Sequence, residues 1–340
     1  MHINNIADLE LPDTVKKSHL RLKINLTANQ RLCIATLLAL CTCLLYLSYN
    51  VTASWEFTLQ FRGKKLLTFL LVAIAISTAT LLFQTLSNNR IITPAIIGFD
   101  SLYILIQTAL LFLLGAMQYT LLNVYLKWAL EISLLVLAAS CLFQWLFVKK
   151  RHSLYLLILI GVVFGVLFHS LASLLMRMMN PAEFTLLEDS MFASFNAADP
   201  HLLLISTMLI GCIGVFVCKY HHQYDVLALG EAIAINLGIN HRRLSRLTLI
   251  IIISLIGLST SLVGPVTFFG LLVVNLAYIV SASHLHRHLI PMAICCAIIT
   301  LVGSDVLLQH FLHYSVKLSI IIEFVGGIFF LVLILRNKIR

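Results

Sequence analysis

Charged residues are scarce in this sequence, and their scarcity excludes most soluble proteins. Only 11% of the 340 residues are Asp, Glu, Lys or Arg, against roughly 25% in a typical soluble domain. In contrast, 60% are hydrophobic and the mean hydropathy is +1.00. This number of charged side chains is too small to cover the surface of a protein in water. The composition excludes a soluble enzyme, a disordered chain and a receptor with a single membrane anchor, and predicts a chain largely surrounded by lipid.

The sequence also lacks a nucleotide-binding loop. A Walker A loop requires a leading Gly and a Ser or Thr after the Lys, but Gly63-Lys64 has Thr58 at the first of these positions and Lys65 at the second. We therefore expect no ATP hydrolysis by this chain.

A metal-binding pattern is missing as well. None of the eight cysteines forms the spaced pairs of a zinc site or a disulfide framework. All lie within or beside apolar runs, so we interpret them as small apolar fillers: Cys33, Cys41, Cys43, Cys141, Cys212, Cys218, Cys295 and Cys296. We expect no catalytic residue, no metal site and no cofactor bound by this chain.

Long apolar runs dominate what remains, and their lengths suit membrane-spanning helices of about 20 residues. The fold class predicted from them is an all-α membrane protein, a polytopic bundle of about ten transmembrane helices. The predicted spans are 32–49, 66–86, 95–116, 121–147, 154–176, 201–218, 244–263, 266–282, 289–309 and 318–335. This pattern divides the chain into an N-terminal segment at 1–31, a transmembrane domain at 32–336 and a tail at 337–340.

The distribution of positive charge predicts the orientation of these spans. With the N-terminus in the cytoplasm, 17 of the 23 Lys and Arg residues fall inside, in keeping with the cytoplasmic excess of positive charge in membrane proteins. The six outside are Arg62, Lys64, Lys65, Lys127, Arg177 and Lys317. Both termini are therefore expected in the cytoplasm.

One polar stretch between the predicted spans has helical character. Residues 224–239 are amphipathic, with acidic residues early and Gly238 near the end, which predicts a short helix lying on the cytoplasmic side. Two spans also begin with a similar pair of residues: Pro94 with Gly98 opens the third, and Pro265 with Gly270 opens the eighth. Such paired interruptions favour an inverted repeat of two halves.

Three motifs together resemble the permease of type II ABC importers, the family that carries ferric siderophores, haem and cobalamin. They are FQTLSNNRIITPAIIG at 83–98, GEAIAINLGI at 230–239 and GPVTFFGL at 264–271. The chain departs from the family at Asn88-Asn89-Arg90-Ile91, where most members carry Asn-Pro-Leu-Ala. It departs again at Val273-Val274-Asn275, where most carry Val-Pro-His. The stretches 100–103 and 322–327 resemble the second permease of heterodimeric iron-siderophore importers, often those for catecholates.

The resemblance implies a set of partners and a location. It implies import of a ferric siderophore by alternating access in the bacterial inner membrane. The partners are a second permease, two ATP-binding subunits that use ATP and a soluble substrate-binding protein, and no nucleic acid is expected. It also implies roles for particular residues. Coupling to the ATPase falls to Asp225, Gly230, Glu231, Ala234, Leu237 and Gly238. Gate or translocation-path candidates are Gln84, Asn88, Asn89, Pro94, Gly98, Gly264, Pro265 and Gly270.

Ionisable residues inside predicted spans support an alternative. Asp305, Glu323 and Glu131 are the kind of acids that a proton-coupled secondary transporter uses, although structural bonds between helices explain them equally. A non-transporting membrane subunit is a third possibility. The alternating histidines His284, His286 and His288 lack an accompanying Cys or acid, so we interpret them as part of a solvated basic loop rather than a metal site.

A basic cluster on the outer side has two interpretations. Arg62, Lys64 and Lys65 run against the inside bias of positive charge. They are candidates for docking the substrate-binding protein, as the resemblance implies. Their side chains can also simply anchor the end of the second span by reaching the membrane surface.

Overall fold

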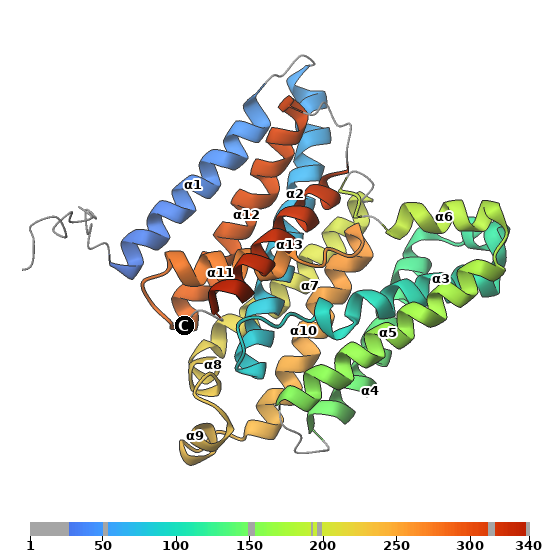
Figure 1. The fold of residues 1–340 in the computed structure, drawn as a ribbon. Coiled ribbons are helices and arrows are strands. Elements are labelled where there is room, and N and C mark those ends of the chain that lie inside the picture. The colour runs from blue at the N-terminus through green and yellow to red at the C-terminus, as the bar shows by residue number, and fades with distance from the viewer. Residues whose placement is uncertain are drawn as a thin grey trace, which may run out of the picture.

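The computed structural model describes residues 27–49, 54–148, 154–191, 193–195, 199–311 and 317–337. Within these ranges all regular structure is helical (Figure 1). Most of the predicted segments 1–31 and 337–340 lie outside the described residues. So do several basic residues used for the orientation: Lys16, Lys17, Arg21, Lys23, Lys149, Lys150, Arg151, Lys338 and Arg340.

Each predicted span corresponds to a helix in the structure, which confirms the all-α membrane class. Eight helices are long and apolar enough to cross a bilayer: α1 (Ala28–Ser48), α2 (Trp55–Ser87), α3 (Phe99–Leu121), α4 (Val124–Val148), α5 (Leu154–Met178), α7 (Pro200–Lys219), α10 (His241–Val263) and α12 (His286–Phe311). Two further apolar helices of the described residues are α11 (Phe269–Val280), which is shorter, and α13 (Leu318–Asn337).

Polar residues at helix starts explain several of the boundaries. Thr27 forms a capping box with Gln30, so each side chain accepts a hydrogen bond from the other residue's backbone N–H. Asp199 caps α7 through the N–H of His201, and Pro200 occupies the first helical position. Asn240 accepts from the N–H of Arg243 at the start of α10. These caps satisfy backbone donors that a helix leaves unpaired at its N-terminus.

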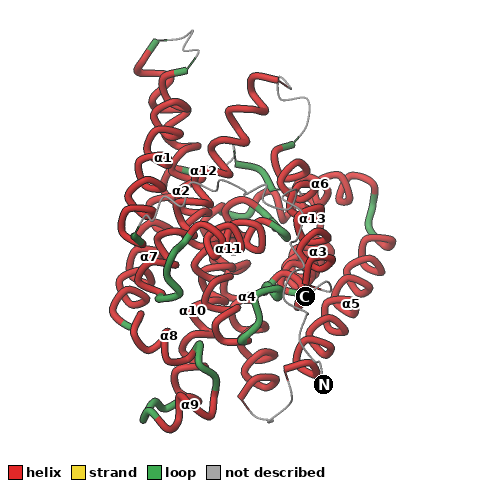
Figure 2. Tube along the Cα trace, turned by 60° about the vertical axis from the view of Figure 1, so that its left-hand side comes forward, coloured by secondary structure: helices red, strands yellow, loops and turns green. Residues whose placement is uncertain are grey.

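The most buried of the long helices, α2, forms the centre of the bundle. Phe69, Val72 and Ala73 on this helix are fully buried. It packs against α7, α10, α11 and α12, while α1 lies along α12 at one side of the molecule (Figure 1). Helices α3, α4, α5 and α6 (Pro181–Met191) gather on the other side, as the second view also shows (Figure 2).

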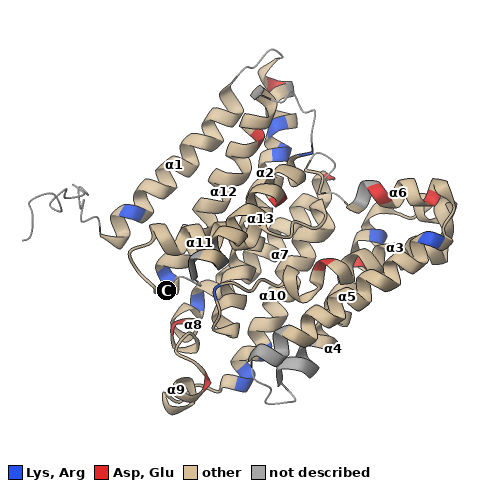
Figure 3. Ribbon diagram, in the orientation of Figure 1, with Lys and Arg blue, Asp and Glu red and all other residues tan. Residues whose placement is uncertain are grey.

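Charged residues lie mainly near the two ends of the bundle (Figure 3). Two short helices, α8 (His221–Leu227) and α9 (Glu231–Asn236), extend beyond the long helices at one end, next to the basic start of α10. The prediction of one continuous helix over 224–239 was wrong. Gly230 has φ 95° and ψ 164°, a backbone conformation outside the helical region, so the stretch divides into two helices joined by a turn.

Two other features differ from the sequence-based expectation. Helix α2 begins at Trp55 rather than near residue 66, so the basic cluster at 62–65 is helical instead of a loop. The charged side chains in its first turns hid this extension from a hydropathy argument. The outer stretch 177–200 contains α6, whose length of 11 residues is too short for a span.

Candidate functional site: the coupling segment and the gate loop

The loop that follows α2, which we call the gate loop (residues 88–94), is held by side-chain bonds to its backbone. Helix α2 ends at Ser87, and the cap residue Asn88 that follows has a left-handed φ of 47°. Nε2 of Gln84 donates to the carbonyl of Arg90 at 2.8 Å, and Nδ2 of Asn275 lies 3.3 Å from the same oxygen. Oδ1 of Asn89 accepts from the N–H of Ile91 at 2.9 Å. These bonds fix the loop to α2 and α11.

Burial of the gate loop is uneven. Ile92, Thr93 and Pro94 are buried, whereas the side chains of Asn88 and Arg90 are exposed. The guanidinium of Arg90 lies 4.5 Å from the ring centre of Tyr278 on α11. The second half of the loop is therefore shielded by protein, as non-helical backbone at membrane depth requires, and the first half faces the end of the bundle.

The gate candidate Gly98 permits a close approach between two backbones. A Cβ built on Gly98 lies 2.6 Å from Cα of Gly165 on α5, and Gly98 itself has φ 100°. The adjoining 3₁₀ turn η2 (Ala95–Ile97) packs through Ile97 against Gly161 of the same helix. Gly161 and Gly165 therefore serve helix packing, since small residues four positions apart let neighbouring backbones approach closely.

The second interrupted element, residues 264–270, enters α11 in a similar way. Gly264 ends α10 with φ 100°, and the carbonyl of Val263 accepts from the N–H of Ser194 at 2.7 Å. Pro265 is buried, and a Cβ on Gly270 meets Thr80 of α2. Both glycine-containing elements thus lie at the start of a helix, at a point where that helix packs closely against a neighbouring helix. The inverted repeat that they suggest stays a prediction.

The coupling segment, residues 224–239, has a buried side and an exposed apolar side. Tyr224 and Ala234 are fully buried, and burial raises the pKa of Tyr224 to about 12, so its phenol is neutral. Leu229, Ile233 and Leu237 are 52%, 48% and 59% exposed. Helices α8 and α9 lie beyond the long helices at one end of the bundle, next to basic residues at the start of α10 (Figure 3).

The structure separates the predicted coupling residues by position. Glu231 is the first residue of α9, Gly230 and Gly238 have positive φ, and Leu237 is exposed. Asp225 lies on α8 instead and faces the bundle, where its Oδ1 accepts from the backbone N–H of His286 at 2.7 Å. Its position therefore argues against a direct contact with a partner.

The outer basic cluster is engaged within the chain at two of its three positions. Nζ of Lys65 is 2.9 Å from Oδ1 of Asp305, and both side chains are buried. A guanidinium nitrogen of Arg62 donates to the carbonyls of Tyr46 and Tyr49 at the end of α1. The charge of Lys65 is therefore neutralised inside the bundle, and docking of a binding protein at this cluster stays a prediction. Lys64 is exposed.

The remaining intramembrane acids occupy different helices. Glu131 on α4 is 5% exposed, and beside it on α3 the hydroxyl of Tyr119 donates to Gln107, whose amide donates to Tyr103. Glu323 on α13 is half-buried. Asp305, which the alternative makes a proton carrier, forms the buried ion pair with Lys65. This is a structural bond between helices, the other explanation that the sequence allowed for these acids.

The histidine triplet differs from its predicted state. Helix α12 begins at His286, and His286 and His288 are buried, so the interpretation as a solvated loop was wrong for these two residues. Among the described residues no three His, Cys, Asp or Glu side chains form a group suited to a metal ion. Sequence reasoning missed both the Asp225–His286 and the Lys65–Asp305 pairs, because each joins residues far apart in the chain.

A bundle of apolar helices with glycine-interrupted spans and protruding short helices defines a multi-pass membrane permease. The family model described as the FecCD transport family matches residues 28–336, and the chain belongs to that family. It is accordingly a permease subunit of the type II ABC importer class, as the motifs indicated.

Individual relatives and one solved structure agree with this assignment. The chain is 40% identical to the petrobactin import system permease protein YclO of Bacillus subtilis strain 168, over 86% of this chain and 93% of YclO. It is 21% identical to a second such permease of that strain, YclN, over 82% of this chain and 85% of YclN. A metal-chelate type ABC transporter in an inward-facing conformation has the same fold, with a TM-score of 0.78 at 21% identity, covering 91% of this chain and 99% of that one.

Proposed function

We propose that this chain imports a ferric siderophore across the bacterial inner membrane by alternating access, driven by ATP that partner subunits hydrolyse. The petrobactin system named for YclO supports a siderophore as the substrate class. Two ATP-binding subunits, a second permease and a soluble substrate-binding protein complete the importer. The chain itself binds no cofactor in this proposal, and both of its termini lie in the cytoplasm.

The observation that carries the proposal is the exposed apolar face of the coupling segment. Leu229, Ile233 and Leu237 each expose about half of their surface on a short element outside the bundle. Such a helix fits the groove of a soluble partner through apolar anchors. The acidic Glu231 at the start of α9 and the basic Arg242 and Arg243 at the start of α10 flank this face with opposite charges. An ATP-binding subunit is the occupant that the family supplies.

Co-purification tests this docking directly. Replacing Leu237 by Asp puts a charge on the apolar face, so the ATP-binding subunits should no longer co-purify with the assembled permease. Leu237→Met keeps an apolar side chain of similar volume and is the matched control, which should retain them. Equal recovery of the ATP-binding subunits with both variants would contradict docking at this face.

The substrate is tested by uptake in vesicles that contain the complete importer. We expect ATP-dependent accumulation of ferric petrobactin or a chemically related chelate, and none of free ferric ion. The bundle suits such a cargo because its membrane segments carry few charged side chains in the described residues. Growth of a deletion strain under iron limitation on single siderophores identifies the chelate. Growth on every siderophore despite the deletion would oppose the assignment.

A proton-coupled transporter is the alternative, and the same vesicles separate the two. Uptake should persist when an ionophore abolishes the proton gradient while ATP is present, and it should stop when ATP is withheld. Asp305→Asn made together with Lys65→Met should retain uptake, because the pair is structural in the ABC proposal. Uptake that follows the proton gradient without ATP would favour the alternative.

A further inference from the structure

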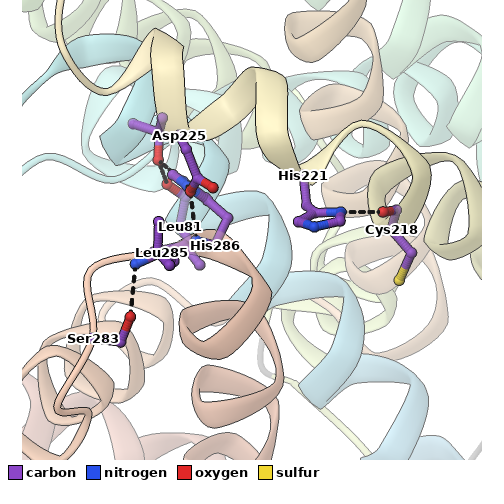
Figure 4. Close-up of polar contacts among 8 residues, drawn as sticks. Leu81, Cys218, His221, Asp225, Ser283, Leu285 and His286 are labelled. Carbon is purple, nitrogen blue, oxygen red and sulfur yellow. Dashed lines mark hydrogen bonds and ion pairs between the residues drawn. The ribbon is translucent and has the colours of Figure 1, made fainter. Parts of the chain in front are cut away.

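A histidine connects the coupling segment to the helix that leads into the gate loop. Both the backbone N–H and the ring Nδ1 of His286 lie 2.7 Å from Oδ1 of Asp225 on α8. On its other side, ring Nε2 lies 2.7 Å from Oγ1 of Thr85 on α2. Figure 4 shows Asp225 and His286 facing each other, while His221 bonds instead to Cys218. We call Thr85, Asp225 and His286 the histidine bridge.

The bridge is complete in either charge state of the ring. The Asp225 carboxylate only accepts, so Nδ1 carries a hydrogen in both states. In the neutral ring, Nε2 accepts from the hydroxyl of Thr85. In the charged ring, Nε2–H donates to that hydroxyl, whose own hydrogen then goes to the carbonyl of Leu81 at 2.9 Å. The connection therefore does not depend on one protonation state.

A second contact lies a few residues further along both elements. A Cβ added at Gly230 would lie 3.6 Å from Nδ2 of Asn88, so the turn between α8 and α9 lies close to the first residue of the gate loop. Thr85 precedes Asn88 by three residues on the last turn of α2. The coupling segment thus contacts the end of α2 at the bridge and lies close to the gate loop one turn further along.

We propose that His286 is a positioning residue that transmits movement of the coupling segment to α2 and the gate loop. His286 is 2% exposed and lies among packed helices. Its ring contacts Asp225 directly, so a displacement of Asp225 displaces the ring as well. The proposal rests on the proposed docking of an ATPase at α9. A movement imposed there reaches α8 through the short turn at 228–230 and continues through Asp225 to His286.

Uptake per hydrolysed ATP separates transmission from simple support of the fold. In vesicles with the complete importer, His286→Gln and Asp225→Ala should keep ATP hydrolysis while uptake per ATP falls about fivefold or more, the lower bound of common coupling energies. The double variant should be no worse than either single variant, because both remove the same connection. His222→Gln, at an exposed histidine on α8, the helix that carries Asp225, is the matched control and should behave as the unmodified protein.

Variants of Thr85 keep the test decisive if the His286 variants fail to assemble. Thr85→Val removes the hydroxyl and leaves the Asp225–His286 contact in place, so it should lower uptake per ATP. Thr85→Ser restores the hydroxyl and should restore the ratio. Hydrogen exchange of the gate loop should respond to a non-hydrolysable ATP analogue in the unmodified importer but not in Thr85→Val.

The outcomes distinguish this inference from the proposed docking. The bridge variants leave the apolar face of α9 intact, so the ATP-binding subunits should still co-purify with them, whereas Leu237→Asp should lose them. Co-purification with an unchanged ratio of uptake to hydrolysis in all bridge variants would overturn the bridge and leave docking standing. Retention of the subunits by Leu237→Asp would overturn docking itself.

Discussion

At the scale of single residues, the pair formed by Lys65 and Asp305 has the greatest consequence for stability. A buried charge without its partner is costly, and breaking such a pair by removing one member destabilises proteins by about 3–5 kcal/mol. Nζ of Lys65 and Oδ1 of Asp305 are 2.9 Å apart, and their side chains are 8% and 2% exposed. The pair joins the N-terminal part of α2 to α12, so the positive charge of Lys65 is balanced within the bundle.

We expect Lys65→Met to lower the stability of the purified protein by about 3–5 kcal/mol, because Asp305 is then buried unpaired. Adding Asp305→Leu should recover most of the loss, since no charge remains to be satisfied. Lys64→Met, at the exposed neighbouring position, should change stability little. Thermal unfolding in detergent measures all three. A Lys65→Met variant as stable as the parent would show that the pair does not hold these helices together.

At the scale of elements, the contact between η2 and α5 depends on two glycines that face each other. The Cβ introduced by Gly98→Ala would lie 2.6 Å from Cα of Gly165, and the backbone at φ 100° is itself unfavourable for alanine. Both obstacles involve backbone, which cannot rotate away. We expect a loss of about 1–3 kcal/mol from overpacking together with a lower yield of the assembled complex.

Gly211→Ala on α7 is the matched control for Gly98→Ala. A Cβ at Gly211 has nothing within 4 Å, so alanine should be neutral or slightly stabilising in this helix. Size-exclusion chromatography of the detergent-solubilised complex and its thermal unfolding measure both variants. Equal stability and equal yield of the two alanine variants would mean that α5 shifts to make room for the added Cβ. The contact would then not fix the start of α3.

The helices were predictable from the sequence because hydropathy and helix length are local properties. The ten apolar runs correspond to ten apolar helices for this reason, and the glycine motifs marked true helix starts. The single helix predicted over 224–239 divides at Gly230, because amphipathic periodicity does not show which glycine adopts a positive φ and ends the helix. The partners of Lys65 and Asp225 were missed because residues 240 and 61 positions apart meet only through the fold.

At the scale of the whole molecule, the end that carries α8 and α9 defines the orientation. If those helices meet a cytoplasmic ATPase, the C-terminus after α13 lies on the same side of the membrane. The reason is that the four helices after α9, which are α10 to α13, cross the membrane an even number of times. A green fluorescent protein fused after Arg340 should therefore fluoresce, and an alkaline phosphatase fused there should be inactive. Fusions within the stretch 181–191 should show the reverse. Phosphatase activity at the C-terminus would invert the proposed orientation and remove α9 from any ATPase.

The last prediction concerns the second permease. YclO and YclN of one Bacillus strain are both named as permeases of the petrobactin system, and this chain is 40% identical to the first but 21% identical to the second. A two-fold interface between identical chains presents each residue twice, whereas two different permeases line a shared path with different side chains. An asymmetric chelate is better matched by the second arrangement.

We therefore expect a tagged copy of this chain, co-expressed with an untagged copy and with a YclN-like permease from the same genome, to recover the YclN-like protein in equal amount. The untagged copy should stay behind, because each importer then contains one copy of each permease. Expression without the YclN-like protein is the control, and should give little assembled complex. Recovery of the untagged copy in a transport-competent complex would identify a homodimer, and the path would then be built from two copies of the residues described above.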